Sequence, residues 1–373
     1  MQQILFHIPI LGIPIYGYGL MLFFSYLFCT ALAKRLCKWQ GINGDFIPDL
    51  AIWLFISALP VGRAVFVMEN WRAQPYPFSD WYWDSITSNS IVRAIALWDG
   101  GLVLYGSLLG GLIGYSIYHV LFMRKRGITV WKMMDVVAPC IVLGIALGRI
   151  GCLCTGCCYG NVACEGCPAI HFPRPAAAWQ AMVYRAHQTP LGFVYRGDTL
   201  EVAAVEPGSP AEKAGLRADD IITQVEVEID GKAKMVPLFR QERFDAISGP
   251  LKFTIHRNGE DKTLAPFTPV SIGVHPTQIY ETISMCLLLF FMLSYFPYRR
   301  REGEMMVIFM FAYAVHRYLN EMLRTDTPPT WSGLTFSQNV SILLLTAGVV
   351  LAVAVWRRPP IGATPPEVPP LAA

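Results

Sequence analysis

The chain has 373 residues, of which 54% are hydrophobic and only 15% are charged. Soluble globular proteins carry about 25% charged residues, so this chain has too little charge to cover a water-facing surface, and we interpret it as a membrane protein. The net charge of +3 is small and its basic residues are scattered, which excludes a nucleic-acid-binding protein.

Seven segments have, or nearly have, the roughly 20 mostly apolar residues that a transmembrane helix needs. In chain order they are Tyr16–Ala33, Ile47–Met68, Gly101–Met123, Met133–Gly151, Gln278–Phe296, Glu304–Met322 and Phe336–Trp356. The basic clusters beside these segments all fall on one side of the membrane if the amino terminus faces out, as the positive-inside rule requires. We therefore expect an external amino terminus and a cytoplasmic carboxyl terminus. Residues 1–15 carry no Lys or Arg, so we expect no cleaved signal peptide.

A charged module interrupts the membrane body. Residues 194–270 hold 10 of the 30 Lys and Arg and 13 of the 27 Asp and Glu. Apolar and polar residues alternate there in short runs, Leu200–Val205, Ile221–Val227 and Leu251–His256, and Asn258-Gly259 is a hairpin turn signal. The fold class expected is an all-α polytopic membrane protein with an inserted small β-rich domain.

This composition predicts four parts. Residues 1–180 hold helices one to four and an outer cysteine-rich segment, 190–269 the insertion, 270–358 helices five to seven, and 359–373 a disordered Pro-rich cytoplasmic tail.

Three arginines, Arg63, Arg149 and Arg317, lie inside apolar segments, where a charge costs at least about 2.5 kcal/mol at mid-bilayer. Each alone fits an interfacial arginine held by a carboxylate, and Arg317 shares a helix face with Tyr313 and Glu321. Together they favour an anionic ligand, because a guanidinium offers phosphate two parallel hydrogen bonds.

Several short blocks follow one another along the chain. They are Tyr18-Gly19-Leu20-Met21, Gly100-Gly101 with Tyr105-Gly106 and Gly110-Gly111, Gly148-Arg149-Ile150-Gly151 ending in Gly156 and Gly160, His275-Pro276-Thr277-Gln278-Ile279-Tyr280-Glu281, and the trio Tyr313, Arg317 and Glu321. Together and in this order they resemble the prolipoprotein diacylglyceryl transferases of bacteria. The resemblance covers roughly residues 10–180 and 270–356.

The resemblance implies a seven-span enzyme of the bacterial inner membrane that moves the diacylglyceryl group of phosphatidylglycerol onto the lipobox cysteine of a prolipoprotein signal peptide. A thioether forms, glycerol phosphate is released, and neither a cofactor nor a metal is implied. Arg149, Arg317 and Tyr105 would be catalytic, with the two arginines on the phosphate. The residues expected to bind the lipid and the acceptor are Tyr18, Arg63, Gly160, His275, Gln278, Tyr280, Glu281, Tyr313 and Glu321.

The chain departs from this family at three positions. Tyr105 stands where many members have His, Cys152 where they have Asn, and Cys157 where they have Glu. Histidine accepts a proton near neutral pH, whereas an ordinary tyrosine with a pKa near 10 donates a hydrogen bond. The residue that takes the proton of the acceptor thiol is therefore left open.

Six cysteines crowd the segment after the fourth predicted span. They are Cys152, Cys154, Cys157, Cys158, Cys164 and Cys167. An oxidising compartment favours disulfides among them, in any of 15 pairings. A metal site of Cys157, Cys158, Cys164 and Cys167, a Cys164–Cys167 redox pair and unpaired packing thiols are the alternatives.

The insertion is similar to PDZ domains of the bacterial protease type, on the run Val205-Glu206-Pro207-Gly208-Ser209-Pro210-Ala211-Glu212-Lys213-Ala214-Gly215-Leu216. In that resemblance Leu191, Gly192 and Phe193 form the loop that holds a peptide carboxylate, and the peptide adds as a strand. A passive spacer is the alternative to a peptide or protein partner.

The membrane spans and the insertion suggest three other functions. An intramembrane metalloprotease is excluded because none of the seven His is followed by Glu, as the H-E-x-x-H zinc motif requires. A related transferase with another acceptor, and a non-catalytic membrane receptor for anionic lipid and peptide, stay open.

Overall fold

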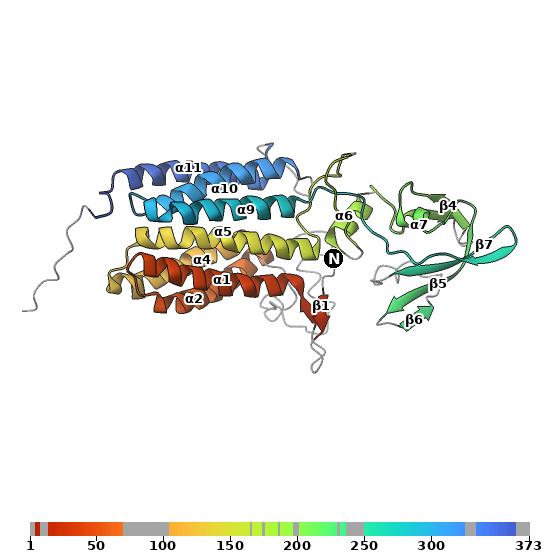
Figure 1. The fold of residues 1–373 in the computed structure, drawn as a ribbon, viewed down its shortest axis with the longest axis horizontal. Coiled ribbons are helices and arrows are strands. Elements are labelled where there is room, and N and C mark those ends of the chain that lie inside the picture. The colour runs from red at the N-terminus through yellow and green to blue at the C-terminus, as the bar shows by residue number, and fades with distance from the viewer. Residues whose placement is uncertain are drawn as a thin grey trace, which may run out of the picture. The chain divides into compact units, whose positions relative to one another are not determined.

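The computed structural model describes residues 4–7, 14–69, 104–164, 166–173, 176–185, 187–196, 201–229, 232–235, 250–324 and 333–362. The chain divides into two compact units. The first comprises Met1–Ser25, Gly144–Leu288 and Met310–Ala347, and the second comprises Tyr26–Leu143, Leu289–Phe309 and Gly348–Ala373. Figure 1 shows the helices and strands with the labels used below.

Six helices among the described residues are long and apolar enough to cross a membrane. These spans contain α1 (Gly17–Trp39), α2 (Ile47–Glu69), α4 (Leu104–Tyr118), α5 (Val130–Thr155), α9 (Thr277–Tyr295) and α11 (Phe336–Trp356). At a rise of 1.5 Å per residue, the 23 residues of α1 extend for roughly 34 Å, which exceeds the ~30 Å hydrocarbon core of a bilayer. The chain is a multi-pass membrane protein.

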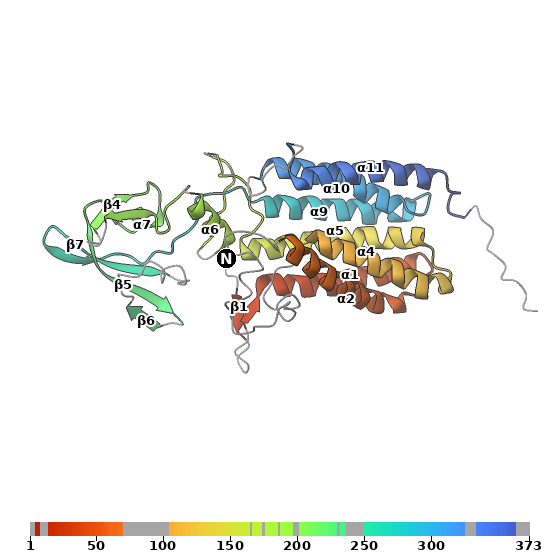
Figure 2. The same cartoon turned by 180° about the vertical axis from the view of Figure 1, so that it is seen from behind.

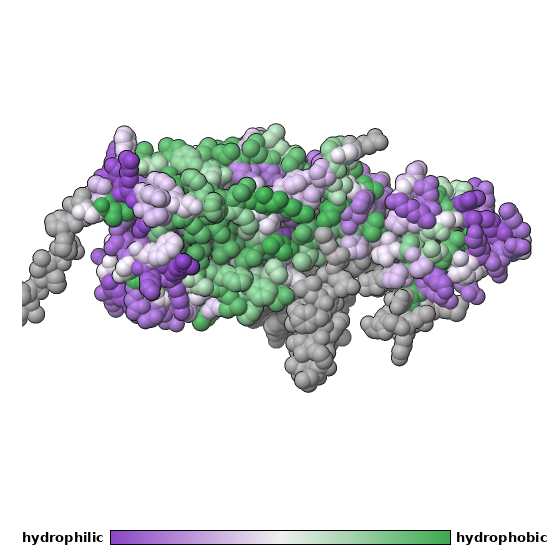
Figure 3. Space-filling model, in the orientation of Figure 1, coloured by the Kyte–Doolittle hydropathy of each residue, from purple (hydrophilic) through white to green (hydrophobic). Residues whose placement is uncertain are grey.

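These helices expose more apolar surface than a water-soluble protein does. Phe55, Leu108, Leu287 and Phe290 each expose 62–74% of their surface. Figure 3 shows a continuous hydrophobic (green) surface along the helices, seen from the side of Figure 1. Such an extended patch is stable only against lipid or a partner protein.

A further helix, α10 (Glu304–Met322), has the bounds that the sequence predicted for the sixth span. It is not among the six helices that qualify by hydropathy. The reason is its polar residues, which include the buried Asn320 and Glu321 and the nearly buried Arg317.

Two predicted spans had wrong bounds. The first span was expected over Tyr16–Ala33, but α1 continues to Trp39, and the fourth was expected over Met133–Gly151, but α5 covers Val130–Thr155. An apolar run stops at the first charge, whereas a helix does not, because lysine and arginine are good helix formers. Leu36 and Cys37, beyond the predicted end of α1, are fully buried.

Within the second unit, α2 and α4 pack backbone to backbone. A Cβ added to Gly106 would lie 2.8 Å from Val65, and one added to Gly110 would lie 2.6 Å from the carbonyl oxygen of Ser57. Close helix packing therefore explains these glycines. The fully buried Asp135 of α5 caps α10, because its carboxylate accepts hydrogen bonds from the N–H of Gly303, just before that helix, and from the N–H of Met305 in its first turn.

The first unit carries a small antiparallel sheet. Its described strands run in the order β3 (Phe193–Arg196), β4 (Glu201–Val205), β5 (Ile221–Ile229), β7 (Leu251–Arg257) and β8 (Glu260–Thr263), with β6 (Lys232–Met235) paired to β5. β4 covers Glu201–Val205 of the predicted run Leu200–Val205, and Leu200 lies outside the described residues. Figure 2 shows these strands with the short helix α7 (Pro210–Lys213) beside them.

The sheet is held by local signals and by one ion pair. Leu251, Phe253 and Ile255 point into the core in strict alternation along β7. Asn258 and Gly259 both have positive φ, at 55° and 87°, which confirms the predicted two-residue hairpin turn. The buried Asp220 accepts a 2.6 Å hydrogen bond from Arg257 and raises the pKa of that guanidinium.

The two ends of the insertion meet. Pro173 pairs with Val270, and the side-chain amide of Gln188 donates to the Val270 carbonyl at 3.2 Å and accepts from the Ile272 N–H at 2.6 Å. The hairpin of β1 (Ile4–His7) and β2 (Pro14–Tyr16) and the helix α6 (Ala177–Tyr184) were not predicted. They are too short to produce a periodic pattern.

Candidate functional site

A buried ion pair joins α5 to α9. Nε of Arg149 lies 2.9 Å from Oε2 of Glu281, and the two side chains are 13% and 1% exposed. The same oxygen accepts a 3.0 Å hydrogen bond from the side-chain amide of Asn320 on α10. Three helices therefore meet at one carboxylate, which holds the guanidinium of Arg149 in place.

A second arginine is held in a similar way on α10. Nη2 of Arg317 lies 2.8 Å from Oε2 of Glu321, one turn later, and donates to the hydroxyl of Ser337 at 2.8 Å. Glu321 is fully buried and also faces Arg324 at 4.0 Å. The predicted trio on one helix face is thus present for Arg317 and Glu321, while Tyr313 interacts electrostatically with Arg149.

Several polar atoms around these pairs have no hydrogen-bond partner among the residues that the structure describes. Nη1 of Arg317, Oε1 of Glu281, Oε1 of Gln278 and Nδ1 of His275 are all buried. A buried polar group without a partner costs about 1–3 kcal/mol. Such a concentration beside two guanidinium groups is typical of a site whose polar ligand completes the hydrogen bonding.

The loop after α5 is tied to the start of α9. The side chain of Gln278 donates to the Cys157 carbonyl at 2.6 Å, and the hydroxyl of Thr277 donates to the Cys158 carbonyl at 2.7 Å. The thiol of Cys157 donates to the Cys152 carbonyl, with 3.7 Å between the sulfur and the oxygen, which ties the same loop to the last turn of α5.

Gly160 lies where three segments converge. Its N–H donates to the His275 carbonyl at 2.9 Å, and an added Cβ would lie 2.8 Å from Cβ of His275 and 2.9 Å from the Leu323 carbonyl oxygen. The close approach of these segments leaves no room for a side chain at position 160. The His275 and Tyr280 rings lie 6.5 Å apart, centre to centre.

An open apolar cavity of about 360 Å³ lies beside the end of α5 and Cys157 in the loop that follows it. Its lining comes from Tyr16, Tyr18, Gly19, Thr155 and Cys157. Tyr18 packs against α5 because Gly151 has no side chain, since an added Cβ would lie 2.9 Å from the Tyr18 ring. The Tyr18 ring stays 43% exposed.

Five of the predicted residues take part in buried polar contacts within the first unit. Arg149 pairs with Glu281, Arg317 pairs with Glu321, and Gln278 bonds to the Cys157 carbonyl.

Arg63 lies in the second unit on α2, buried, with its guanidinium 5.2 Å from the ring centre of Phe66. Tyr105 falls in the first turn of α4, and its side chain lies outside the described residues. Leu191 and Phe193 are core residues of the sheet, and Gly192 between them has a φ of 82°.

Sequence reasoning missed Asn320, Ser337 and Arg324. Asn320 precedes Glu321 directly, so a polar residue inside an apolar segment was the available signal. Ser337 and Arg324 gave no such signal, because both stand at helix ends where polar residues are ordinary.

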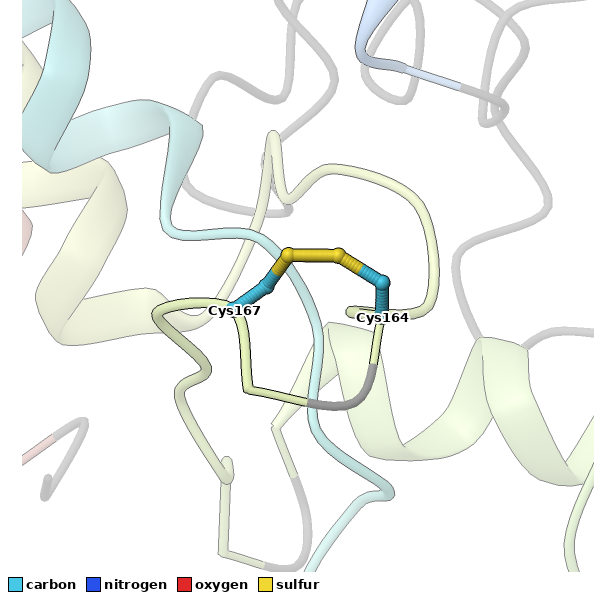
Figure 4. The surroundings of a disulfide bond; sticks show 2 residues. All are labelled: Cys164 and Cys167. Atoms are coloured by element: carbon cyan, nitrogen blue, oxygen red, sulfur yellow. A yellow bond between two sulfur atoms is a disulfide. The ribbon is translucent and has the colours of Figure 1, made fainter.

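The cysteine cluster resolves into two groups. A disulfide joins Cys164 to Cys167 (Figure 4). The other four cysteines of the segment, Cys152, Cys154, Cys157 and Cys158, carry free thiols in this structure. The metal site considered from the sequence needed Cys164 and Cys167 as thiolates, which the disulfide does not provide.

The sequence of this chain matches one family of known proteins over most of its length. The sequence profile of the prolipoprotein diacylglyceryl transferase family matches residues 3–354. A phosphatidylglycerol–prolipoprotein diacylglyceryl transferase of Rhodopirellula baltica is 27% identical over 386 aligned positions, covering 93% of this chain and 73% of the relative. One of Clostridium tetani is 24% identical, covering 94% of this chain and 96% of the relative. One of Synechococcus elongatus is 34% identical over 36% of this chain and 40% of its own length.

The family match spans both membrane segments that carry the arginine and carboxylate network as well as the sheet between them. This chain therefore belongs to the prolipoprotein diacylglyceryl transferase family.

Proposed function

We propose that this chain is a phosphatidylglycerol–prolipoprotein diacylglyceryl transferase, which forms a thioether between the diacylglyceryl group and the cysteine of a prolipoprotein. The observation that carries this function is the pair of nearly buried arginines, Arg149 and Arg317, each held by a buried carboxylate at 2.9 and 2.8 Å. The names of the relatives from Rhodopirellula baltica and Clostridium tetani support the substrates.

The reaction breaks the bond between the glycerol carbon and the phosphate oxygen while the acceptor sulfur bonds to that carbon. Negative charge grows on the leaving phosphate, so guanidinium groups that are already in place stabilise the transition state. In this proposal Arg149 and Arg317 bind the phosphate, and the unpartnered Nη1 of Arg317 donates to it. Glu281 and Glu321 orient the two guanidinium groups.

The apolar cavity suits the lipid tails. A diacylglycerol needs an apolar space that opens toward the bilayer, and the cavity of about 360 Å³ beside Tyr18 is lined almost entirely by carbon. We propose that Tyr18 and Tyr313 border the lipid head, and that His275, Gln278 and Tyr280 shape the adjacent wall together with Gly160.

We further propose seven spans, with α10 as the additional one, in the bacterial inner membrane. A helix whose polar residues are buried against its neighbours can cross lipid despite its low hydropathy. The basic clusters support an external amino terminus and a cytoplasmic carboxyl terminus. Labelling of single cysteines from either side of spheroplasts tests both statements, and accessibility of the Pro-rich tail from outside would contradict them.

The sheet is proposed to be an external PDZ-like module over residues 190–269 that binds a peptide terminus or an exposed strand. In the described part of the sheet β3 has only β4 beside it, so one edge is available for strand addition. Leu191, Gly192 and Phe193 would supply the carboxylate-binding loop. Affinity for C-terminal peptides should then fall when the carboxylate is amidated.

The module should be dispensable for the chemistry. Gln188 and Val270 are hydrogen-bonded to each other, so a short Gly/Ser linker can join the two ends without moving them. We expect the linker variant to keep basal transfer. Complete loss of transfer in a correctly inserted variant would make the module part of the active-site architecture.

The function is tested with purified protein, labelled phosphatidylglycerol and a lipobox peptide, with the thioether detected by mass spectrometry. Arg149→Ala or Arg317→Ala should lower the rate about 10²- to 10³-fold, as expected for a lost contact to a developing oxyanion. Lysine at either position should restore only part of it, because the bidentate fork is lost. Wild-type transfer by a folded alanine variant, or lack of complementation in a transferase-depleted cell by the native chain, would refute the proposal.

A further inference from the structure

Three free thiols converge at the end of α5. The sulfur atoms of Cys152, Cys157 and Cys158 all lie within 4.8 Å of one another, and all three residues are partly buried. Cys154, in the same helical turn as Cys152, is not part of this group. Three thiols gathered from a span of seven residues are a specific arrangement rather than a consequence of composition.

The backbone is built to bring them together. Gly156 ends the helix with a φ of 72°, and Cys158 itself has a φ of 58°, a left-handed conformation that costs energy in a residue with a side chain. The N–H groups of Gly156 and Cys157 both donate to the Cys152 carbonyl, at 2.9 and 3.2 Å. The hydrogen bonds from Thr277 and Gln278 fix the same loop from the other side. The loop is thus held in the shape that faces the three sulfur atoms toward one another.

Disulfide pairing does not account for this group. Three thiols form at most one disulfide among themselves and leave one sulfur over, whereas the nearby Cys164 and Cys167 pair completely. A thiophilic cation accommodates all three at once. In tetrahedral zinc with Zn–S bonds of about 2.3 Å, the sulfur atoms lie about 3.8 Å apart, so the trio closes onto a metal with small side-chain movements.

The electrostatic surroundings fit a metal–thiolate centre. Three thiolates and one divalent cation carry a net charge of −1, and Arg149 interacts electrostatically with both Cys152 and Cys158. The site is also reachable, because Cys157 lines the open apolar cavity beside Tyr18. Metal centres that bind a substrate typically have three protein ligands and leave the fourth coordination position open to the substrate.

We propose that Cys152, Cys157 and Cys158 form a three-thiolate site for a thiophilic divalent cation such as zinc, and that the thiol of the acceptor peptide is its fourth ligand. The second part rests on the proposed function. The acceptor thiol releases its proton to solvent on binding the metal. Its sulfur then donates an electron pair to the glycerol carbon as the C–O bond breaks, and that bond's electrons leave on the phosphate. The metal thereby supplies the thiolate that a base would otherwise produce, which accounts for activity with tyrosine at position 105.

The metal site is tested on the full-length protein in detergent, loaded with Zn²⁺ or with Co²⁺ as a spectroscopic probe. We expect about one zinc per chain by elemental analysis and an intense sulfur-to-cobalt charge-transfer band. Cys152→Ser, Cys157→Ser and Cys158→Ser should each lower occupancy roughly tenfold or more, while the matched variant Cys154→Ser should keep it. Because a serine variant can fail to fold, the native protein is also alkylated with and without a chelator. The metal should protect the three thiols, and the chelator should expose them.

Occupancy that is the same in all four serine variants, or a disulfide between two of the three cysteines in active protein, overturns the site. The role in catalysis has its own readout. Adding a lipobox peptide should strengthen the charge-transfer band, whereas the same peptide with serine in place of its cysteine should not. Unchanged transfer after complete removal of zinc would overturn this role and leave the proposed function intact. A zinc-loaded protein that forms no thioether from any lipid and peptide would instead overturn the proposed function and leave the metal site intact.

Discussion

Replacing Gly160 by alanine should damage this protein although it adds only one methyl group. Gly160 contacts the segment before α9 and the end of α10 at once, through hydrogen-bonded backbone rather than flexible side chains. The added Cβ would lie 2.8 Å from Cβ of His275, 2.9 Å from the Leu323 carbonyl oxygen and 2.9 Å from Cγ2 of Thr277.

The magnitude follows from these three distances. Carbon atoms pack at about 3.5–4.0 Å, so each neighbour must move by roughly half an ångström or more. Cβ of His275 and the Leu323 carbonyl oxygen cannot rotate away, and the Thr277 side chain can rotate only by breaking its hydrogen bond to the Cys158 carbonyl. Overpacking of this kind costs typically about 1–3 kcal/mol of the free energy of unfolding. Movement of Thr277 also shifts the loop that carries Cys158, and displacements approaching 1 Å at a reacting centre can cost about 10²-fold in rate.

Thermal unfolding in detergent and the thioether assay check both effects, with Gly111→Ala as the matched control. Gly111 lies in α4, and no atom of the described residues stands within 4 Å of an added Cβ there, so its alanine variant should be neutral or slightly stabilising. We expect Gly160→Ala to unfold at a clearly lower temperature and to transfer at least about tenfold more slowly than the control. Equal midpoints and equal rates for the two variants would refute the close-approach argument.

Three further predictions concern other parts of the chain. Asp135→Asn should lower the unfolding midpoint by removing charged hydrogen bonds, including that to Gly303, worth about 1.5–3 kcal/mol each, and an unchanged midpoint would contradict the capping role. Asp220→Asn should weaken the pair with Arg257 and speed hydrogen exchange in β7, with the helices as internal reference. Tyr105→Phe should reduce transfer moderately without moving its pH profile, since an ordinary tyrosine stays protonated at neutral pH, and loss of the alkaline limb would show that this phenol titrates.

The sequence by itself determined the features whose cause is local. The ends of α11, and those of α2 to within one residue, follow from apolar composition over about 20 residues, which needs no knowledge of neighbours. The hairpin at Asn258-Gly259 follows from the positive φ that these two residue types tolerate. The anionic ligand inferred from three arginines in apolar segments stays a prediction, based on the cost of burying a charge.

Only the tertiary structure shows which residues from distant segments of the chain contact one another. Glu281 binds Arg149 although 132 positions separate them in the sequence, and Asn320 joins the same carboxylate from a third helix. The sequence does not show which three of the six clustered cysteines lie together. Their proximity depends on the left-handed backbone of Gly156 and Cys158, which turns the chain after α5. Local preferences act within a few residues, whereas these contacts depend on how helices pack and which side chains then share one buried space. Helix packing depends on the burial of many residues at once, and a short sequence motif contains no information about it.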